Sequence, residues 1–201
     1  KKEGRNSVRF FDPEMQATLI ERSALESDLR HALGRQQLRL YYQIQVNNER
    51  RAIGAEALLR WIHPERGLIL PEQFIPLAEK TGLIVPIGLW VLQTACAQIR
   101  DWSGNPATSN LQLALNASAL ELRQPDFVEH VRQAISTTGI NPALLKIELT
   151  ESQLIDNISD TVAKMNALKA LGIRFSMDDF GTAYSSIAYL KQLPLDQLKI
   201  D

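Results

Sequence analysis

The stretch that decides the fold is "IRFSMDD", residues 173–179, in which apolar and polar residues alternate. Ile, Phe and Met occupy its first, third and fifth positions, and Arg, Ser and Asp occupy the second, fourth and sixth. This is the period of a β-strand with one apolar and one polar face. The segment ends in two adjacent aspartates, Asp178 and Asp179. Burying a carboxylate without a partner is costly, so a cation or hydrogen-bond donors are expected beside the pair.

The same alternation recurs in "LQLALN" (111–116), "LKIELT" (145–150) and "QLKI" (197–200), and helical patterns separate these segments. A strand–helix cadence predicts a mostly parallel sheet. A doubly wound sheet buries both faces under helices and favours continuous apolar strands. A closed barrel instead accepts polar side chains in its interior. The alternation therefore favours a closed α/β barrel over the doubly wound sheet.

The first two strands are expected to be antiparallel neighbours, because only a short turn joins "LRLYYQIQV" (38–46) to "AIGAEALLRW" (52–61). About six strands are predicted in the chain. The other four strands cover residues 111–118, 144–152, 173–179 and 196–201. The predicted helices cover residues 12–33, 71–82, 88–102, 125–139, 159–172 and 184–193. For the helix 159–172, Ser159 is the predicted N-cap and Gly172 the residue that follows the helix end.

The composition is that of an ordinary globular protein, with 45% hydrophobic and 22% charged residues among 201 and a formal net charge of −1. This charge predicts no broad basic face for duplex nucleic acid. The single cysteine, Cys96, excludes an internal disulfide and fits a reducing cytoplasm. It lies in an apolar helical pattern and is expected to be a packed core thiol. The longest apolar segment, 82–99, contains Pro86 and Gln93 and predicts a buried helix, without membrane contact from this segment.

Polar residues recur where successive strands end. The C-terminal face of a barrel is where such side chains converge. One polar strand end is unremarkable and is compatible with simple solvent exposure, but the recurrence on one face favours a site. Carboxylate and amide oxygens are hard ligands, which suit Mg²⁺ or Mn²⁺ better than zinc, and the paired aspartates allow two ions. The candidates are Glu56, Asn116, Glu148, Asp178, Asp179 and Lys199, whereas His31, His63 and His130 are expected on helices or turns away from them.

Five ordered motifs resemble those of the EAL-domain cyclic di-GMP phosphodiesterases, and the segment 63–84 is also similar to that family. The resemblance implies an α/β fold, a TIM-like (β/α)8 barrel whose first strand is antiparallel. It also implies hydrolysis of cyclic di-GMP to linear pGpG, and a homodimer. It implies that residues 20–201 form an EAL domain whose C-terminal part is missing. Residues 1–19 resemble the tail of a GGDEF-like domain with a linker, so GGDEF and sensory domains are expected in the same parent chain. The motifs are "EALLRW" (56–61), "LNAS" (115–118), "ELTES" (148–152), "DDFGTAYSS" (178–186) and "LKID" (198–201).

The resemblance also implies a role for each matching residue. The residues that match metal ligands are Glu56, Asn116, Glu148, Asp178 and Asp179. The residues that match catalytic positions are Lys199, Asp179 and Glu56, and Lys199 matches the lysine that positions the attacking water. The matching substrate-binding residues are Gln43, Leu58 and Arg60, and Glu151 matches a loop anchor.

The chain departs from the family pattern at Ile44, Ala117 and Ala183, where proline, leucine and glycine are usual, and in lacking a later acidic segment. None of these three positions is a metal ligand. Two alternatives remain beside the enzyme: a catalytically inactive module that senses cyclic di-GMP, and a purely structural dimerisation domain. The intact ligand set favours the enzyme.

Overall fold

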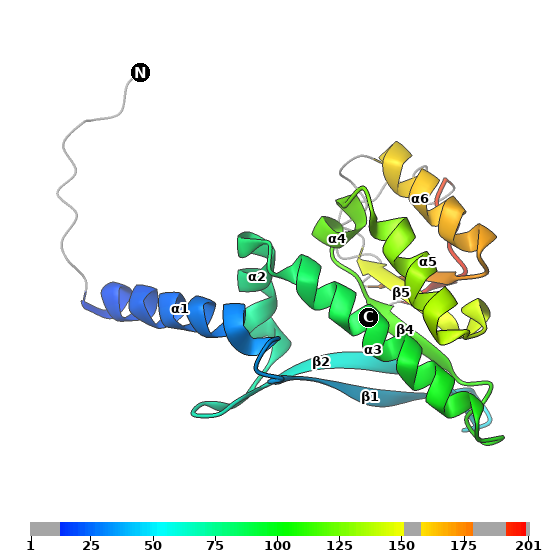
Figure 1. Ribbon diagram of the computed structural model, residues 1–201, viewed down its shortest axis with the longest axis horizontal. Helices are drawn as coiled ribbons and strands as arrows, with labels where there is room; N and C mark the ends of the chain where they lie inside the picture. The colour runs from blue at the N-terminus through cyan, green and yellow to red at the C-terminus, as the bar shows by residue number, and fades with distance from the viewer. Residues whose placement is uncertain (1–12, 151–157, 179–191, 200–201) are drawn as a thin grey trace.

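The computed structural model describes residues 13–150, 158–178 and 192–199 (Figure 1). Helices and strands alternate along most of the chain, as the sequence predicts. The elements are α1 (Pro13–Ala32), β1 (Leu38–Val46), β2 (Ala52–His63), β3 (Gly67–Ile69), α2 (Pro71–Thr81), α3 (Ile84–Ser103), β4 (Gln112–Asn116), α4 (Ala119–Arg123), α5 (Phe127–Thr138), a short 3-10 helix (Pro142–Leu144), β5 (Leu145–Thr150), α6 (Ile158–Ala170), β6 (Arg174–Asp178) and β7 (Gln197–Leu198).

The strands form one sheet in the order β1-β2-β4-β5-β6-β7, and β3 pairs with β2 outside this path. β1 and β2 are antiparallel, as predicted from the short turn, whereas β2, β4, β5, β6 and β7 pair in parallel. The turn is closed by the side chain of Asn47, whose Oδ1 accepts hydrogen bonds from the backbone N–H groups of Glu49 and Arg51, each at 3.0 Å. The sheet is therefore dominated by parallel pairs, as in part of a TIM-like barrel.

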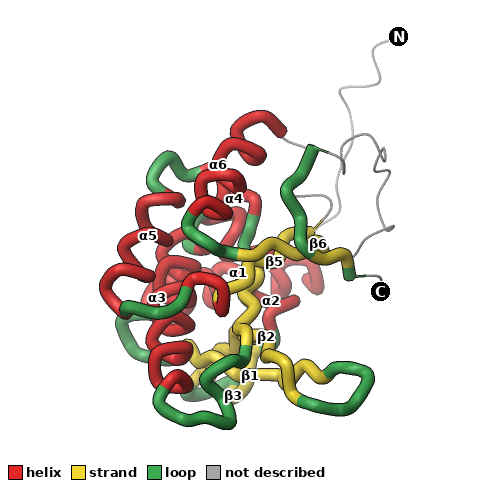
Figure 2. Tube along the Cα trace, turned by 90° about the vertical axis from the view of Figure 1, so that its right-hand side faces the viewer, coloured by secondary structure: helices red, strands yellow, loops and turns green. Residues whose placement is uncertain are grey.

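One face of the sheet is covered by helices, and Figure 2 shows α3, α4, α5 and α6 gathered on one side of the strands. The apolar positions of the alternating strands pack against this layer, because Leu113, Leu145 and Phe175 are fully buried. Cys96 of α3 is also fully buried, and burial raises the pKa of its thiol to about 12. The prediction of a core thiol is confirmed. The polar positions of the same strands lie on the opposite face of the sheet.

Strand β2 continues two residues beyond its predicted end, so His63 is a strand residue and the expectation of a helix or turn there is wrong. His63 is buried, and its Nδ1 accepts hydrogen bonds from the backbone N–H groups of Glu65 and Arg66. Its Nε2 lies 3.3 Å from Asp28 Oδ2 of α1. The imidazole thus closes the β2–β3 turn and fastens it to α1.

Other boundaries differ by a few residues. α3 begins at Ile84 rather than at residue 88, because Pro86 falls in its first turn, where a missing N–H costs nothing. α6 begins at Ile158, so Ser159 lies inside its first turn and is not the N-cap. The elements β3 and α4 were not predicted. The predicted helix 184–193 lies mostly outside the described residues. Among the helices of the described part of the chain, none combines the length and the apolar character that crossing a membrane requires.

Candidate metal centre

Three carboxylates from three strands of the sheet meet near the carboxyl ends of β5 and β6. Glu56 lies on β2, Glu148 on β5 and Asp178 at the end of β6. Each offers one oxygen, and these oxygens all lie within 4.8 Å of one another. The strand register produces this, because Glu56 pairs with Ala114, two residues before Asn116. Asn116 in turn pairs with Glu148, and Thr150, two residues after Glu148, pairs with Asp178.

Lys199 bridges the three carboxylates. Its Nζ donates to Glu148 Oε2, and it lies 3.3 Å from both Glu56 Oε2 and Asp178 Oδ2. Its backbone N–H donates to the Met177 carbonyl at 2.8 Å, which places Lys199 just beyond β7, beside the end of β6. Burial by itself lowers the pKa of this ammonium. The hydrogen bond and charge of Glu148, with the charges of Glu56 and Asp178, outweigh burial and raise the pKa to about 12.

Asn116 joins the cluster through Glu56. Its Nδ2 donates to Glu56 Oε1 at 2.8 Å, so the amide and the carboxylate are held side by side. The backbone N–H of the next residue, Ala117, donates to the Glu148 carbonyl at 3.0 Å, which ties the end of β4 to β5. The predicted first-site residues Glu56, Asn116, Glu148 and Asp178 are therefore neighbours, together with Lys199.

A second lysine lies inside the sheet, next to Glu148. Lys146 is buried; its Nζ donates to Gln197 Oε1 at 2.9 Å and lies 3.7 Å from Glu148 Oε1. Glu148 is therefore flanked by Lys199 at Oε2 and by Lys146 at Oε1. Burial raises the pKa of Glu148, and the hydrogen bond and charge of Lys199 act against this. The sequence placed Lys146 on the polar face but gave no reason to single it out.

Two buried oxygens in this region support a site for a cation. Within residues 13–150, 158–178 and 192–199, Glu148 Oε1 and Ser176 Oγ are buried side-chain atoms without a hydrogen-bond partner. Glu148 and Ser176 are paired on adjacent strands, so their side chains share one face. Buried oxygens normally have a partner. A set of hard oxygen donors with spare acceptor capacity fits a divalent cation such as Mg²⁺ or Mn²⁺.

The β1–β2 ladder extends this face beyond the carboxylates. Opposite residues of an antiparallel pair point to the same side, and Gln43 pairs with Glu56. The next two pairs on that face are Tyr41 with Leu58 and Arg39 with Arg60. The structure thus brings the three residues expected to bind substrate, Gln43, Leu58 and Arg60, onto the face that carries Glu56. Asp179 and Glu151, also expected at the site, lie outside the described residues.

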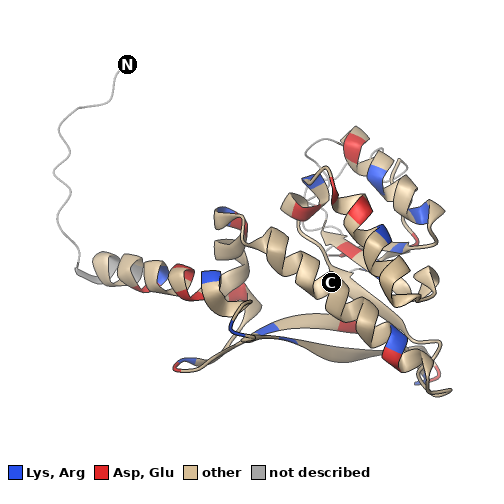
Figure 3. Ribbon diagram, viewed as in Figure 1, with Lys and Arg blue, Asp and Glu red and all other residues tan. Residues whose placement is uncertain are grey.

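The carboxylate cluster contrasts with the surface of the helices. Figure 3 shows acidic and basic residues interspersed over α1, α3, α5 and α6. In the described part of the chain, Glu56, Glu148 and Asp178 are the group of acidic, histidine or cysteine side chains close enough to share one ion. Like-charged carboxylates at such distances need a cation between them, which Lys199 supplies in part.

Comparisons with known proteins match most of this chain to one family. The EAL domain family model matches residues 26–201. The chain is 48% identical over 203 residues to the bifunctional diguanylate cyclase/cyclic di-GMP phosphodiesterase MucR of Pseudomonas aeruginosa, covering all of this chain and 29% of MucR. It is 40% identical over 201 residues to the cyclic di-GMP phosphodiesterase NbdA of the same organism, covering 98% of this chain and 25% of NbdA.

A solved structure of the MucR phosphodiesterase in complex with c-di-GMP superposes with a TM-score of 0.84 at 48% identity, covering 89% of this chain and 72% of that one. The chain spans less than a third of the length of the two curated relatives. The family match covers most of the chain, and the fold and the motif order agree with it. The chain belongs to the EAL domain family.

Proposed function

We propose that this domain is a phosphodiesterase that hydrolyses one phosphodiester bond of cyclic di-GMP and releases linear pGpG. The observation that carries the proposal is the convergence of Glu56, Glu148 and Asp178 around Lys199. The names of MucR and NbdA, which are called cyclic di-GMP phosphodiesterases, support the choice of substrate.

The cofactor would be Mg²⁺ or Mn²⁺, as two ions. Glu56, Asn116, Glu148 and Asp178 would hold the first ion, and Asp178 with Asp179 the second. When bound there, divalent cations supply a Lewis acid for the phosphate oxygens and lower the pKa of a nearby water. The dense set of carboxylates, with the spare acceptor at Glu148 Oε1, supports this assignment.

The chain's own groups then bind and orient the substrate. The Nζ of Lys199 donates to Glu148 Oε2 and lies 3.3 Å from both Glu56 Oε2 and Asp178 Oδ2, so its ammonium is placed to donate a hydrogen bond to a water aimed at phosphorus. Arg60 would hold a phosphate with its guanidinium, which suits planar, paired hydrogen bonding to oxyanions. Gln43 and Leu58 would contact a guanine, and Glu151 would anchor the loop that follows Asp179.

A sensor that binds cyclic di-GMP without cleaving it is the alternative that the same geometry allows. Substituting Glu56→Ala separates the two, because it removes one carboxylate but leaves Arg60 and Gln43 in place. We expect turnover by the intact protein to fall by about two to three orders of magnitude or more, while cyclic di-GMP still binds. Chromatography of the products and titration calorimetry measure the two quantities. Near-normal turnover in this variant would show that Glu56 is only structural, and a wild type that binds without cleaving would establish the sensor.

We further propose that the domain acts in a cytoplasmic homodimer and shares its parent chain with GGDEF and sensory domains. The name of MucR, which combines a diguanylate cyclase with a phosphodiesterase, supports the GGDEF neighbour. The N-terminal helix α1 extends away from the sheet in Figure 1, and its exposed Leu19 and Ile20 support a role in association.

A further inference from the structure

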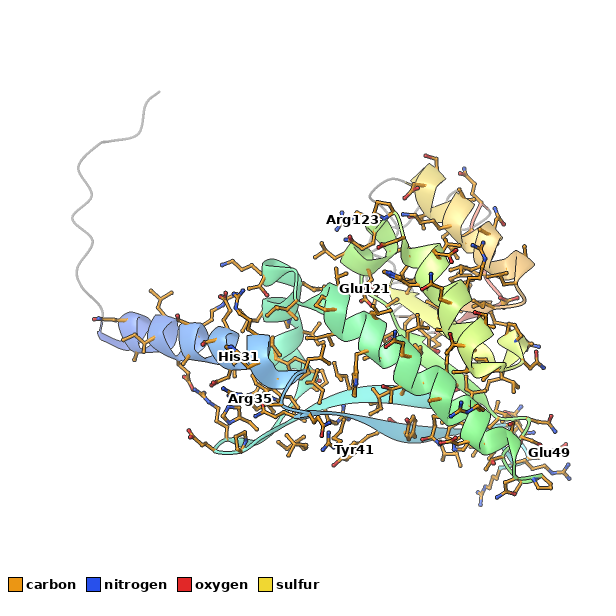
Figure 4. The ribbon with its side chains drawn as sticks, viewed as in Figure 1. His31, Arg35, Tyr41, Glu49, Glu121 and Arg123 are labelled. Carbon is orange, nitrogen blue, oxygen red and sulfur yellow. The ribbon has the colours of Figure 1, made fainter. Side chains whose placement is uncertain are left out.

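Tyr41 lies on the open face of β1, which the helices do not cover. The neighbouring Tyr42 fixes this orientation, because its ring packs edge-on against Trp102 of α3 with 5.5 Å between ring centroids. Successive side chains of a strand point to opposite faces, so Tyr41 points away from α3. Figure 4 shows it on the side of β1 opposite to α3, and 52% of the residue is exposed.

The position of Tyr41 on that face is between the carboxylates and an arginine. Tyr41 pairs with Leu58, while the pairs on either side are Gln43 with Glu56 and Arg39 with Arg60. Two residues along a strand advance about 7 Å, so the Cα atom of Tyr41 lies about 7 Å along β1 from the Cα atom of Gln43, which is paired with Glu56. On the other side, Arg60 Cζ lies 5.9 Å from the centroid of the Tyr41 ring.

Packing does not explain this tyrosine. It is not part of the hydrophobic core, and over half of it is exposed. A contact between an arginine and an exposed ring contributes only about 0.5–1 kcal/mol. An exposed aromatic ring is, however, a surface on which nucleobases stack. An arginine beside it holds the accompanying phosphate, and the guanidinium of Arg60 is within reach of this position.

We propose that Tyr41 is a substrate-binding residue whose ring stacks on one guanine of the cyclic dinucleotide, while Arg60 holds the adjacent phosphate. The inference rests on the proposed function and adds a residue to that site. Stacking depends on the π-face and not on the hydroxyl group, so phenylalanine can replace this tyrosine. It also acts on the bound substrate as much as on the transition state, so its loss raises KM and leaves kcat nearly unchanged.

Steady-state hydrolysis of cyclic di-GMP by the intact protein tests the first part. Tyr41→Ala should raise KM about 10- to 100-fold with kcat within about threefold of wild type, whereas Tyr41→Phe should match wild type. Ile44→Ala is the matched control, because Ile44 is also exposed on β1 but lies on the opposite face. An unchanged KM in Tyr41→Ala, or an equal rise in Ile44→Ala, overturns the inference.

A fluorescence titration distinguishes stacking of a guanine on this side chain from a role of Tyr41 in positioning Arg60. In Tyr41→Trp, cyclic di-GMP should quench the added indole emission relative to wild type, and in Ile44→Trp it should not. Equal responses of the two tryptophan variants overturn the stacking role. If wild type neither binds nor cleaves cyclic di-GMP, the proposed function itself fails, and the inference fails with it. If wild type cleaves cyclic di-GMP normally and Tyr41→Ala is unaffected, the inference about Tyr41 fails and the proposed function stands.

Discussion

At the scale of single residues, the candidate site depends on how the negative charge of the buried Glu148 is balanced by nearby lysines. Glu148 is fully buried, and it is compensated from two sides by Lys199 and Lys146. Lys199 was predictable, because it ends a strand in the motif "LKID" and stands beside acidic strand ends. Lys146 was not, because its role depends on Gln197, which is 51 positions away and reaches it only through the sheet. Pairings of this kind are set by register, which the sequence does not state.

We predict that Lys146→Met destabilises the protein by about 2–3 kcal/mol. Breaking a buried ion pair typically costs about 3–5 kcal/mol, and the cost is smaller here because Lys199 still faces Glu148. Denaturant unfolding measures the change. Lys169→Met is the control, since Lys169 and Asp196 form a partly exposed pair, 2.7 Å apart, whose loss should cost under about 1 kcal/mol. Equal losses in the two variants would contradict the view that Lys146 supports Glu148.

At the scale of elements, the long strands and helices were predictable and the short ones were not. β1 has its predicted bounds, and α5 ends before Gly139, whose φ of 68° explains the glycine. β3 has three residues and α4 five, too few for a periodic pattern. α4 nonetheless carries a signal that could have found it. In "SALE" (118–121), Ser118 Oγ accepts from the Glu121 N–H and Glu121 Oε2 accepts from the Ser118 N–H, which is a capping box.

Glu121 makes the stability of this element depend on pH. Figure 4 places Glu121 between α4 and α3, and its carboxyl fills the space that a side chain at Gly88 would need. Burial raises the pKa of Glu121 from 4.5 to about 7, against the hydrogen bonds from Ser118. Between these values the folded protein keeps a proton that the unfolded chain has released. Stability therefore falls as pH rises from about 4.5 to 7 and then levels off.

We predict that this loss amounts to about 3 kcal/mol and that Glu121→Gln removes it. Glutamine keeps the shape and an acceptor oxygen but has no proton to release. Unfolding free energies of wild type and Glu121→Gln, measured between pH 4.5 and pH 8, should therefore diverge as pH rises, with the variant the more stable above pH 7. Parallel pH profiles for the two proteins would rule out a raised Glu121 pKa as the cause.

At the scale of the whole molecule, helices cover one face of the sheet, and the opposite face carries the carboxylate cluster and Lys199. The alternation of apolar and polar residues predicted this division, because it is a property of each strand taken alone. The meeting of Glu56, Glu148 and Asp178 could be anticipated from parallel strands ending at one edge. The spatial neighbours of each side chain could not be anticipated, such as His63 beside Asp28, because tertiary packing determines them.

Association belongs to the same scale. We predict a weak homodimer whose population rises with cyclic di-GMP, because the resemblance to the EAL domains implies that the loop after the paired aspartates links the metal site to a dimer contact. Sedimentation velocity of the intact protein with and without the dinucleotide measures it. A protein that is fully active and strictly monomeric under both conditions would contradict a link between association and activity.

The measurement that tests the central claim most directly is hydrolysis of cyclic di-GMP by the intact protein as divalent cations are removed and returned. The carboxylates of Glu56, Glu148 and Asp178 face one another within 4.8 Å, and we expect them to act through hard cations. Excess EDTA should abolish formation of pGpG, and added Mg²⁺ or Mn²⁺ should restore it. Turnover that persists unchanged in excess chelator would contradict the account.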